Sequence, residues 1–175
     1  MPTQSRLAEV QLADAFMNAP KSLDGAPPVW GSGAWGGEYA TSWNVLDGDG
    51  APAASLRFTA KKSDPSIVSI NLIWRNRPLW RVDVEPPITS HANPPDAWSL
   101  GLPAAVMGTH SHPWDANRAH VLAQIEQWDL PYRRQAPIAV RRLEQALLWF
   151  GDQIGITIDP DQRGFDGPTK SDLFD

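Results

Sequence analysis

Cysteine is absent from this chain of 175 residues. Its absence excludes disulfide bonds, thiolate metal ligands and a cysteine nucleophile, so thiol proteases and thioester-forming carriers are ruled out. The sequence also has no apolar run near the roughly 20 residues that a membrane-spanning helix needs. Its first ten residues, MPTQSRLAEV, lack the basic and then apolar pattern of a signal peptide. We therefore expect a cytoplasmic protein with no membrane partner.

Positive charge is in the minority, because 15 Lys and Arg residues face 20 Asp and Glu residues and give a formal net charge of −5. An acidic chain does not adhere broadly to nucleic acids or anionic membranes, although a local basic patch can still hold a phosphate backbone. Hydrophobic residues make up 42% of the chain, and nine residues are Trp. We expect one domain over residues 1–175, since this length suffices for one core and is short for two.

Alternating apolar residues predict a β-sheet in the middle of the chain. Residues 40–47, 53–62, 66–74 and 79–85 have the pattern of strands, and short turns rich in Gly, Pro, Asn and Asp separate them. Residues 104–112, AAVMGTHSH, are a candidate for a fifth strand, which Pro113 would end. The short turns predict an antiparallel meander of four to five strands within residues 38–112.

Helical spacing of apolar residues flanks this sheet. The pattern predicts an N-terminal helix within residues 1–20, and the Gly-, Pro- and Trp-rich residues 21–37 predict an irregular loop pinned by Trp30 and Trp35. Two more helices are expected at 115–128, with Asp115 as N-cap, and at 136–155, within a helical part at 115–158. Residues 159–175 form an acidic tail, in which Phe165 and Leu173 are candidates for docking on the body. The predicted fold class is α+β, with the N-terminal and C-terminal helices packed on one face of the sheet.

Two polar pairs lie on the predicted strands. Side chains two residues apart on a strand point to the same face, so Arg81 joins Asp83, and His110 joins His112. If the two strands are neighbours, the four side chains converge on a face open to solvent, and the connecting loop brings His91 to them. We interpret this cluster as a functional site. The plainer alternative is a structural Arg–Asp ion pair beside surface histidines.

The residue types in this cluster fit RNA cleavage without a cofactor. That reaction needs a base for the 2′-hydroxyl, an acid for the leaving oxygen and a cation for the transition state. Imidazole titrates near neutral pH, so we predict His110 and His112 as acid and base and Arg81 as the cation, supported by Asp83 and His91. The residues expected to bind the RNA substrate are Asn93, Trp114, Asn117 and Arg118.

A metal site is the alternative interpretation of the same histidines. Three imidazoles and a water can form an open tetrahedral site, so His110 and His112, with His91 or His120, could ligate zinc or another divalent metal of a hydrolase. Two known H-x-H patterns do not fit. JAMM metallopeptidases have Ser and Asp where this chain has His120 and Ala123. The cupin pattern requires a barrel of strands, whereas helices are predicted here.

The order LWRVDV, SHANPPD, GTHSHPW and LLWFGDQIGITI resembles a family of small uncharacterised bacterial proteins with the pattern hydrophobic-R-x-D, H-x-N-P-D and H-x-H. The resemblance covers residues 66–158. That family is similar to the toxin halves of some toxin–antitoxin pairs, so the resemblance implies ribonuclease activity and a protein antitoxin as partner. This chain departs from the pattern at Pro95, which is inserted into N-P-D-G. The family's polar positions fall on Arg81, Asp83, His91, Asn93, His110 and His112.

A binding protein is the other class of function that the sequence leaves open. The leading helix, the four-stranded meander, the histidine-containing loop and the C-terminal helices also resemble the ubiquitin-conjugating fold. Without cysteine, the chain could only be a non-catalytic relative of those enzymes. Its Trp-rich loop and acidic tail would then contact a protein partner, as in a phage or immunity protein that blocks its target. Replacing both His110 and His112 by Ala would abolish an enzyme and leave a binding protein active.

Overall fold

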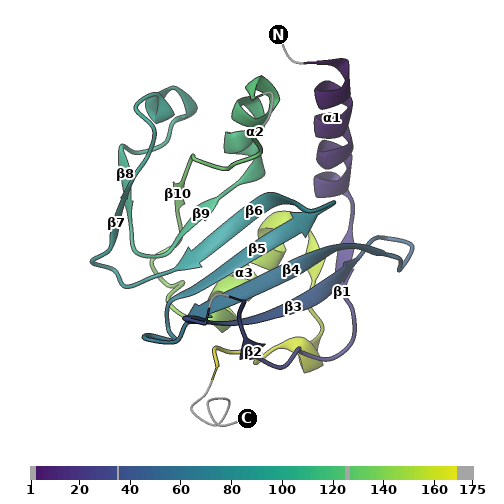
Figure 1. The fold of residues 1–175 in the computed structure, drawn as a ribbon, viewed down its shortest axis with the longest axis vertical. Helices are drawn as coiled ribbons and strands as arrows, with labels where there is room; N and C mark the ends of the chain where they lie inside the picture. Colours follow the sequence, from purple (N-terminus) through teal and green to yellow (C-terminus); the bar gives the residue numbers. More distant parts are fainter. Residues whose placement is uncertain (1–2, 35, 125–126, 169–175) are drawn as a thin grey trace.

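The computed structural model describes residues 3–34, 36–124 and 127–168, and the chain has an α+β fold (Figure 1). The helices of these residues are α1 (Gln4–Asn18), α2 (Trp114–Ala123) and α3 (Leu143–Ile154). Two short 3-10 helices, η1 (Ala97–Leu100) and η2 (Pro160–Gln162), lie in the connecting segments. Within the described residues, no helix has the length and hydrophobicity that crossing a membrane requires.

The described residues place nine strands in one curled sheet, so the prediction of a four- to five-stranded meander is wrong in extent. The predicted meander forms its centre as β3 (Glu38–Leu46), β4 (Pro52–Lys61), β5 (Val68–Trp74) and β6 (Arg77–Val84), all antiparallel. The order is β10-β9-β6-β5-β4-β3-β1-β11, with β2 beside β3. Four strands lie outside residues 38–112 and are too short to show a period of two in the sequence. They are β1 (Lys21–Leu23), β2 (Gly31–Ser32), β10 (Arg134–Gln135) and β11 (Ile156–Thr157).

The expected fifth strand at 104–112 is two strands in two sheets. β8 (Ala105–Met107) pairs with β7 (Ser90–Ala92) in a separate two-stranded sheet, whereas β9 (His110–His112) joins the main sheet beside β6. Gly108 lies between them with a φ of 63°, which glycine adopts without strain. A Cβ at this position would be 2.9 Å from the Cα of Pro87. The chain therefore needs glycine here to turn β9 into the main sheet.

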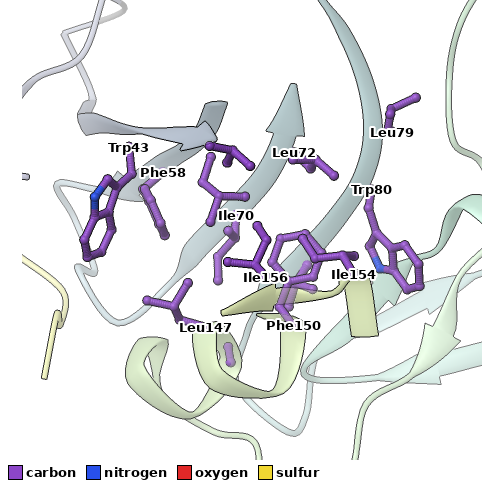
Figure 2. Close-up of a cluster of buried hydrophobic side chains, with 14 of the residues drawn as sticks. Trp43, Phe58, Ile70, Leu72, Leu79, Trp80, Leu147, Phe150, Ile154 and Ile156 are labelled. Carbon is purple, nitrogen blue, oxygen red and sulfur yellow. The ribbon is translucent and has the colours of Figure 1, made fainter. Parts of the chain in front are cut away.

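Helix α3 covers one face of the main sheet and forms the hydrophobic core with it (Figure 1). Figure 2 shows Leu147, Phe150 and Ile154 of α3 close to Ile70 and Leu72 of β5. All five side chains are buried, and burying a side chain of this kind contributes roughly 1.5–3 kcal/mol. The side chains that alternate with them along the strands point to the opposite face of the sheet, where α3 does not cover them.

Helix α2 lies beside α1 at one end of the sheet, not on the face that α3 covers (Figure 1). Asp14 of α1 accepts a hydrogen bond from Nε1 of Trp114 and two from Nε of Arg118, each at 2.8 Å. The prediction that both C-terminal helices pack on one face therefore holds for α3 alone. Pro113 is the N-cap of α2, so Asp115 lies in the first turn and is not the cap.

Only half of the described residues in the helical part predicted at 115–158 are helical. α2 ends at Ala123 and α3 begins at Leu143, and β10 lies in the segment between them. Ile138, which the apolar spacing assigned to the core face of a helix, is 85% exposed. Pro137 precedes it. The segment before α3 includes the strand β10 and a turn at residues 138–139, in which the N–H of Val140 donates to the carbonyl of Pro137.

The loop predicted at 21–37 and the tail predicted at 159–175 meet on the body of the protein. The loop contains β1 and β2, so it is not irregular throughout. Trp30 stacks on Phe165 with the ring centroids 5.7 Å apart, which confirms the docking of Phe165. Trp35 and Leu173 lie outside the described residues.

Candidate metal centre

Strands β6 and β9 bring the two predicted polar pairs together. They are antiparallel neighbours in which Arg81 pairs with His112 and Asp83 pairs with His110. The expectation that the two strands are adjacent and present these side chains to one patch is confirmed. The expectation of a site in open solvent is wrong, because Asp83, His110 and His112 are at most 5% exposed.

The carboxylate of Asp83 is held by donors on one oxygen and faces the histidines with the other. Its Oδ1 accepts hydrogen bonds from Oγ of Ser69 at 2.5 Å and from Nε of Arg81 at 2.8 Å. Its Oδ2 lies 3.5 Å from Nε2 of His110 and 3.3 Å from Nε2 of His112. Burial raises the pKa of Asp83, but the contact with His112, the charge of Arg81 and the hydrogen bond from Ser69 outweigh it and hold the pKa well below its usual range. Asp83 is therefore a buried carboxylate that stays ionised.

Backbone carbonyls set the orientation of both imidazoles. Nδ1 of His110 lies 2.8 Å from the carbonyl oxygen of Gly108, and Nδ1 of His112 lies 2.5 Å from that of Leu130. A carbonyl oxygen only accepts, so each Nδ1 carries the hydrogen and each neutral ring has its lone pair on Nε2. Nε2 of His110 is buried without a hydrogen-bond partner. Both lone pairs therefore point at one oxygen of Asp83.

This arrangement suits a metal ion. One oxygen of Asp83 and one nitrogen of each histidine all lie within 4.8 Å of one another. Ligand atoms on a tetrahedral zinc ion with bonds of about 2.05 Å are about 3.3 Å apart, close to the two Asp83–histidine distances. A hydrogen bond from the second ring nitrogen to a carbonyl is the usual support of a metal-bound histidine. A neighbouring strand thus supplies a carboxylate where the sequence led us to expect a third imidazole.

His91 and His120, the candidates for that third imidazole, have other partners. The ring of His91 lies 4.6 Å from the ring of His110, centroid to centroid, but its Nε2 lies 2.6 Å from Oε2 of Glu85. His91 is thus beside the centre and outside the group of three ligands. Nε2 of His120 lies 3.0 Å from Oδ1 of Asp129, so the structure does not bring His120 into the cluster.

The two asparagines predicted to bind substrate have structural contacts. Asn117 is fully buried, donates to the carbonyls of Pro113 and Tyr132, and accepts from the backbone N–H of Tyr132. Asn93 makes the same kind of clasp with Pro103 and Arg133. Both amides hold the segment around residues 130–133 against its neighbours. Their expected role in substrate binding gains no support from these contacts.

Trp114 and Arg118 likewise contact α1. The ring of Trp114 is buried and stacks on Trp128 with the centroids 5.7 Å apart. Its Nε1 and the guanidinium of Arg118 both bind Asp14, whose pKa is lowered: burial raises it, and these two partners lower it by more. These residues join the two helices, and nothing in the contacts directs them toward a substrate.

Three features of the centre were not found from the sequence. Ser69 on β5 lies directly across from Asp83 on β6. The predicted turn between these two strands sets their register, so Ser69 could have been identified by counting back from that turn. Glu85 continues the alternation of Arg81 and Asp83 along the chain and was overlooked at the end of the strand. The carbonyls of Gly108 and Leu130 leave no sequence signal, because any residue can supply a carbonyl.

Comparison of the chain with protein-family models, with curated proteins and with solved structures gives no match. The resemblance to toxin halves of toxin–antitoxin pairs, and the ribonuclease activity that it implies, stay predictions. A function for this chain is therefore inferred from the contacts of Asp83, His110 and His112.

Proposed function

We propose that this chain binds a divalent transition metal at Asp83, His110 and His112 and uses it in hydrolysis, with zinc as the metal that fits best. The observation that carries the proposal is the direction of the imidazoles, which donate Nδ1–H to backbone carbonyls and present both Nε2 lone pairs to Asp83. Lone pairs that face a carboxylate in a buried site are unfavourable unless a cation lies between them. A metal ion is that cation.

Zinc is favoured by ligand type and by spacing. Imidazole ligands suit zinc, copper, iron and nickel, and zinc also accepts a carboxylate oxygen beside them. Adjacent ligand atoms around an octahedral ion with bonds of about 2.1 Å are about 3.0 Å apart, which is shorter than the observed 3.3 and 3.5 Å. The tetrahedral spacing of about 3.3 Å agrees better.

Hydrolysis is supported by the number of ligands and by the groups around them. Three protein ligands leave one position of a tetrahedral ion for water, and zinc lowers the pKa of that water to about 7. The Glu85–His91 pair packs against His110 and is suited to accept the proton of the water. A pocket of about 300 Å³ is lined by Ser69, Arg81 and Glu85 among others, though by none of the three proposed ligands, and offers room for a substrate beside Glu85.

The metal-free ribonuclease receives less support from the same contacts. His110 is buried, and burial lowers its pKa although the carbonyl of Gly108 and the charge of Asp83 raise it. An acid or base in that reaction must reach the ribose and the leaving oxygen, whereas both histidines point at a buried carboxylate. Arg81, which is 45% exposed, is the member of the predicted set that a phosphate could reach.

Metal content tests the proposal directly. The wild-type chain is stripped with a chelator, reloaded with zinc, dialysed and analysed for metal, beside the His110→Ala/His112→Ala variant. His120→Ala is the matched control, because that imidazole binds Asp129 outside the centre. We expect one zinc ion per chain in the wild type and the control, and none in the double variant. Equal metal content in all three proteins would overturn the metal centre.

Activity is tested on the same preparations. Zinc-loaded wild type is expected to hydrolyse a chromogenic ester or phosphodiester, and the chelator-treated protein and the double variant are expected to lose that activity. RNA degradation that resists the chelator and needs His110 and His112 would instead favour the metal-free ribonuclease. A chain that binds a protein partner equally well with and without these histidines would favour a binding protein.

A further inference from the structure

An apolar pocket of about 520 Å³ lies next to the candidate metal centre and includes none of its three ligands. Its walls come from residues 84–87 at the end of β6, residues 107–109 from the end of β8 to the start of β9, and residues 135–138 and 140–141 between the end of β10 and α3, with Ser66 also on its lining. Val84, Ala136 and Val140 supply buried apolar side chains, and Ile138 is exposed. A volume of this size accommodates a small organic ligand.

The pocket is held open by rigid segments. The backbone of Gly108 packs against Pro87 so closely that even a Cβ would not fit, and its N–H donates to the carbonyl of Thr89 at 2.7 Å. The side chain of Gln135 bonds the N–H and the carbonyl of Met107, at 2.8 and 2.7 Å. Prolines at 86, 87 and 137 restrict the backbone further. Because the walls are preformed, a ligand would bind without ordering them.

Charge on the lining indicates what kind of ligand fits. Arg141 is exposed, its Nε donates to the carbonyl of Ile138 at 3.1 Å, and no carboxylate of the described residues pairs with it. Glu85 is the one acidic residue on the lining, and its carboxylate is bonded to His91. The remaining charge that a ligand can meet is therefore the guanidinium of Arg141.

We propose that this pocket binds an organic anion with an apolar body, namely a carboxylate that carries an alkyl or aryl group. The body lies against Val84, Ala136 and Val140, and the carboxylate accepts hydrogen bonds from Arg141. The ligand covers Ile138, whose apolar surface water otherwise contacts. This site goes beyond the proposed metal centre and needs no metal ion. Glu85 lies on this lining and, through His91, also touches the centre.

Fluorescence titration with 1-anilinonaphthalene-8-sulfonate tests the site, because this probe joins an aryl body to an anionic group. Decanoate and decylamine then compete with the bound probe. The variants are Arg141→Gln and Ile138→Asp, which change exposed side chains and leave the core intact. The matched controls are Arg142→Gln, an exposed neighbour outside the pocket, and Val29→Asp, an exposed apolar residue elsewhere.

We expect saturable probe binding that decanoate displaces and decylamine does not. Loss of a charge-assisted hydrogen bond corresponds to about a tenfold rise in Kd for Arg141→Gln, and the carboxylate introduced by Ile138→Asp should weaken binding at least as much. Both controls should match the wild type. Absence of saturable binding, equal Kd in Arg141→Gln and Arg142→Gln, or stronger competition by decylamine would overturn the proposal. The zinc content of the same samples should stay unchanged whether or not the probe binds. The proposal of the pocket and the proposal of the metal centre can therefore fail separately.

Discussion

Asp83 lies directly across from His110 in the β6–β9 pair, and its Oδ2 is 3.5 Å from Nε2 of that histidine. This separation is too long for a strong hydrogen bond and close to the separation of two ligand atoms on one zinc ion. Nδ1 of His110 already donates to Gly108, so the neutral ring has no hydrogen to offer Asp83. The pair is therefore arranged around a cation, and its properties with and without metal should differ.

Ser69→Ala should weaken zinc binding without removing a ligand. The hydroxyl of Ser69 donates to Oδ1 of Asp83 at 2.5 Å and orients the carboxylate. Loss of such a supporting hydrogen bond typically lowers metal affinity by about 10- to 100-fold. Competition with a chromophoric chelator measures the affinity. Ser55→Ala on β4 is the matched control, since none of the described hydrogen bonds involves that side chain, and an unchanged Kd in Ser69→Ala would contradict the supporting role.

Acid should destabilise the metal-free protein in two steps. Burial lowers the pKa of His110 below its ordinary value of about 6.5, and the pKa of Asp83 lies below its ordinary value of about 3.9. In the unfolded chain, each of these two side chains is protonated at a higher pH than in the folded chain. The free energy of unfolding therefore falls as the pH falls. The loss attributable to His110 begins near pH 6.5, and that attributable to Asp83 begins near pH 3.9.

Urea unfolding at a series of pH values, with a chelator present, measures these steps. His110→Gln should remove the step that begins near pH 6.5 and keep the more acidic one. His120→Gln, which changes an imidazole outside the centre, should keep both. A free energy of unfolding that rises as the pH falls from 7 to 5 would contradict the burial of a neutral His110.

The two polar pairs could be predicted from the sequence, because the geometry of a strand determines which of its side chains share a face. Side chains two apart share a face, so Arg81 lies with Asp83 and His110 with His112 wherever those strands are. Their adjacency was a conditional expectation, and it holds because β9 pairs with β6. The burial of the site could not be predicted, since alternation along a strand shows which side chains share a face and not whether other segments cover that face.

The extent of the sheet was beyond sequence reasoning for a related reason. β10 and β11 have two residues each, and such strands are formed by their pairing with β9 and β1 and not by their own pattern. The helix predicted from 136 has apolar spacing at its start, but the contacts of Gln135 with β8 and the turn that follows Pro137 occupy that part of the chain. Tertiary pairing overrides weak local preference in both cases.

Asn117→Ala should destabilise the fold rather than change a binding surface. The amide makes three hydrogen bonds, two to carbonyls of Pro113 and Tyr132 and one from the N–H of Tyr132. Leaving these buried groups without partners costs about 3 kcal/mol in the free energy of unfolding. Urea denaturation measures the loss, with Asn71→Ala on β5 as control because no described hydrogen bond involves its side chain. A stability equal to that of the wild type, together with a loss of ligand binding, would restore the substrate role predicted for Asn117.

Asp83→Asn should separate the stability of the fold from the binding of metal. The amide oxygen can still accept from Ser69 and Arg81, while the amide nitrogen donates to the Nε2 lone pairs of His110 and His112. The metal-free variant is expected to be less stable than the metal-free wild type, since the lowered pKa of Asp83 means that the folded chain favours the charged carboxylate, but more stable than Asp83→Ala.

Thermal unfolding with and without zinc measures both effects. At a free zinc concentration of 100 times Kd, the wild type gains about 2.7 kcal/mol, which raises Tm by roughly 5–10 °C for a chain of this length. Asp83→Asn should show little of this rise, because an amide is a much weaker zinc ligand than a carboxylate. Asp83→Ala removes the acceptor for Ser69 and Arg81 as well, so it should lose both the zinc-dependent rise and stability without metal. If Asp83→Asn unfolds well below the metal-free wild type and still gains the full rise with zinc, Asp83 stabilises the fold and does not ligate the metal.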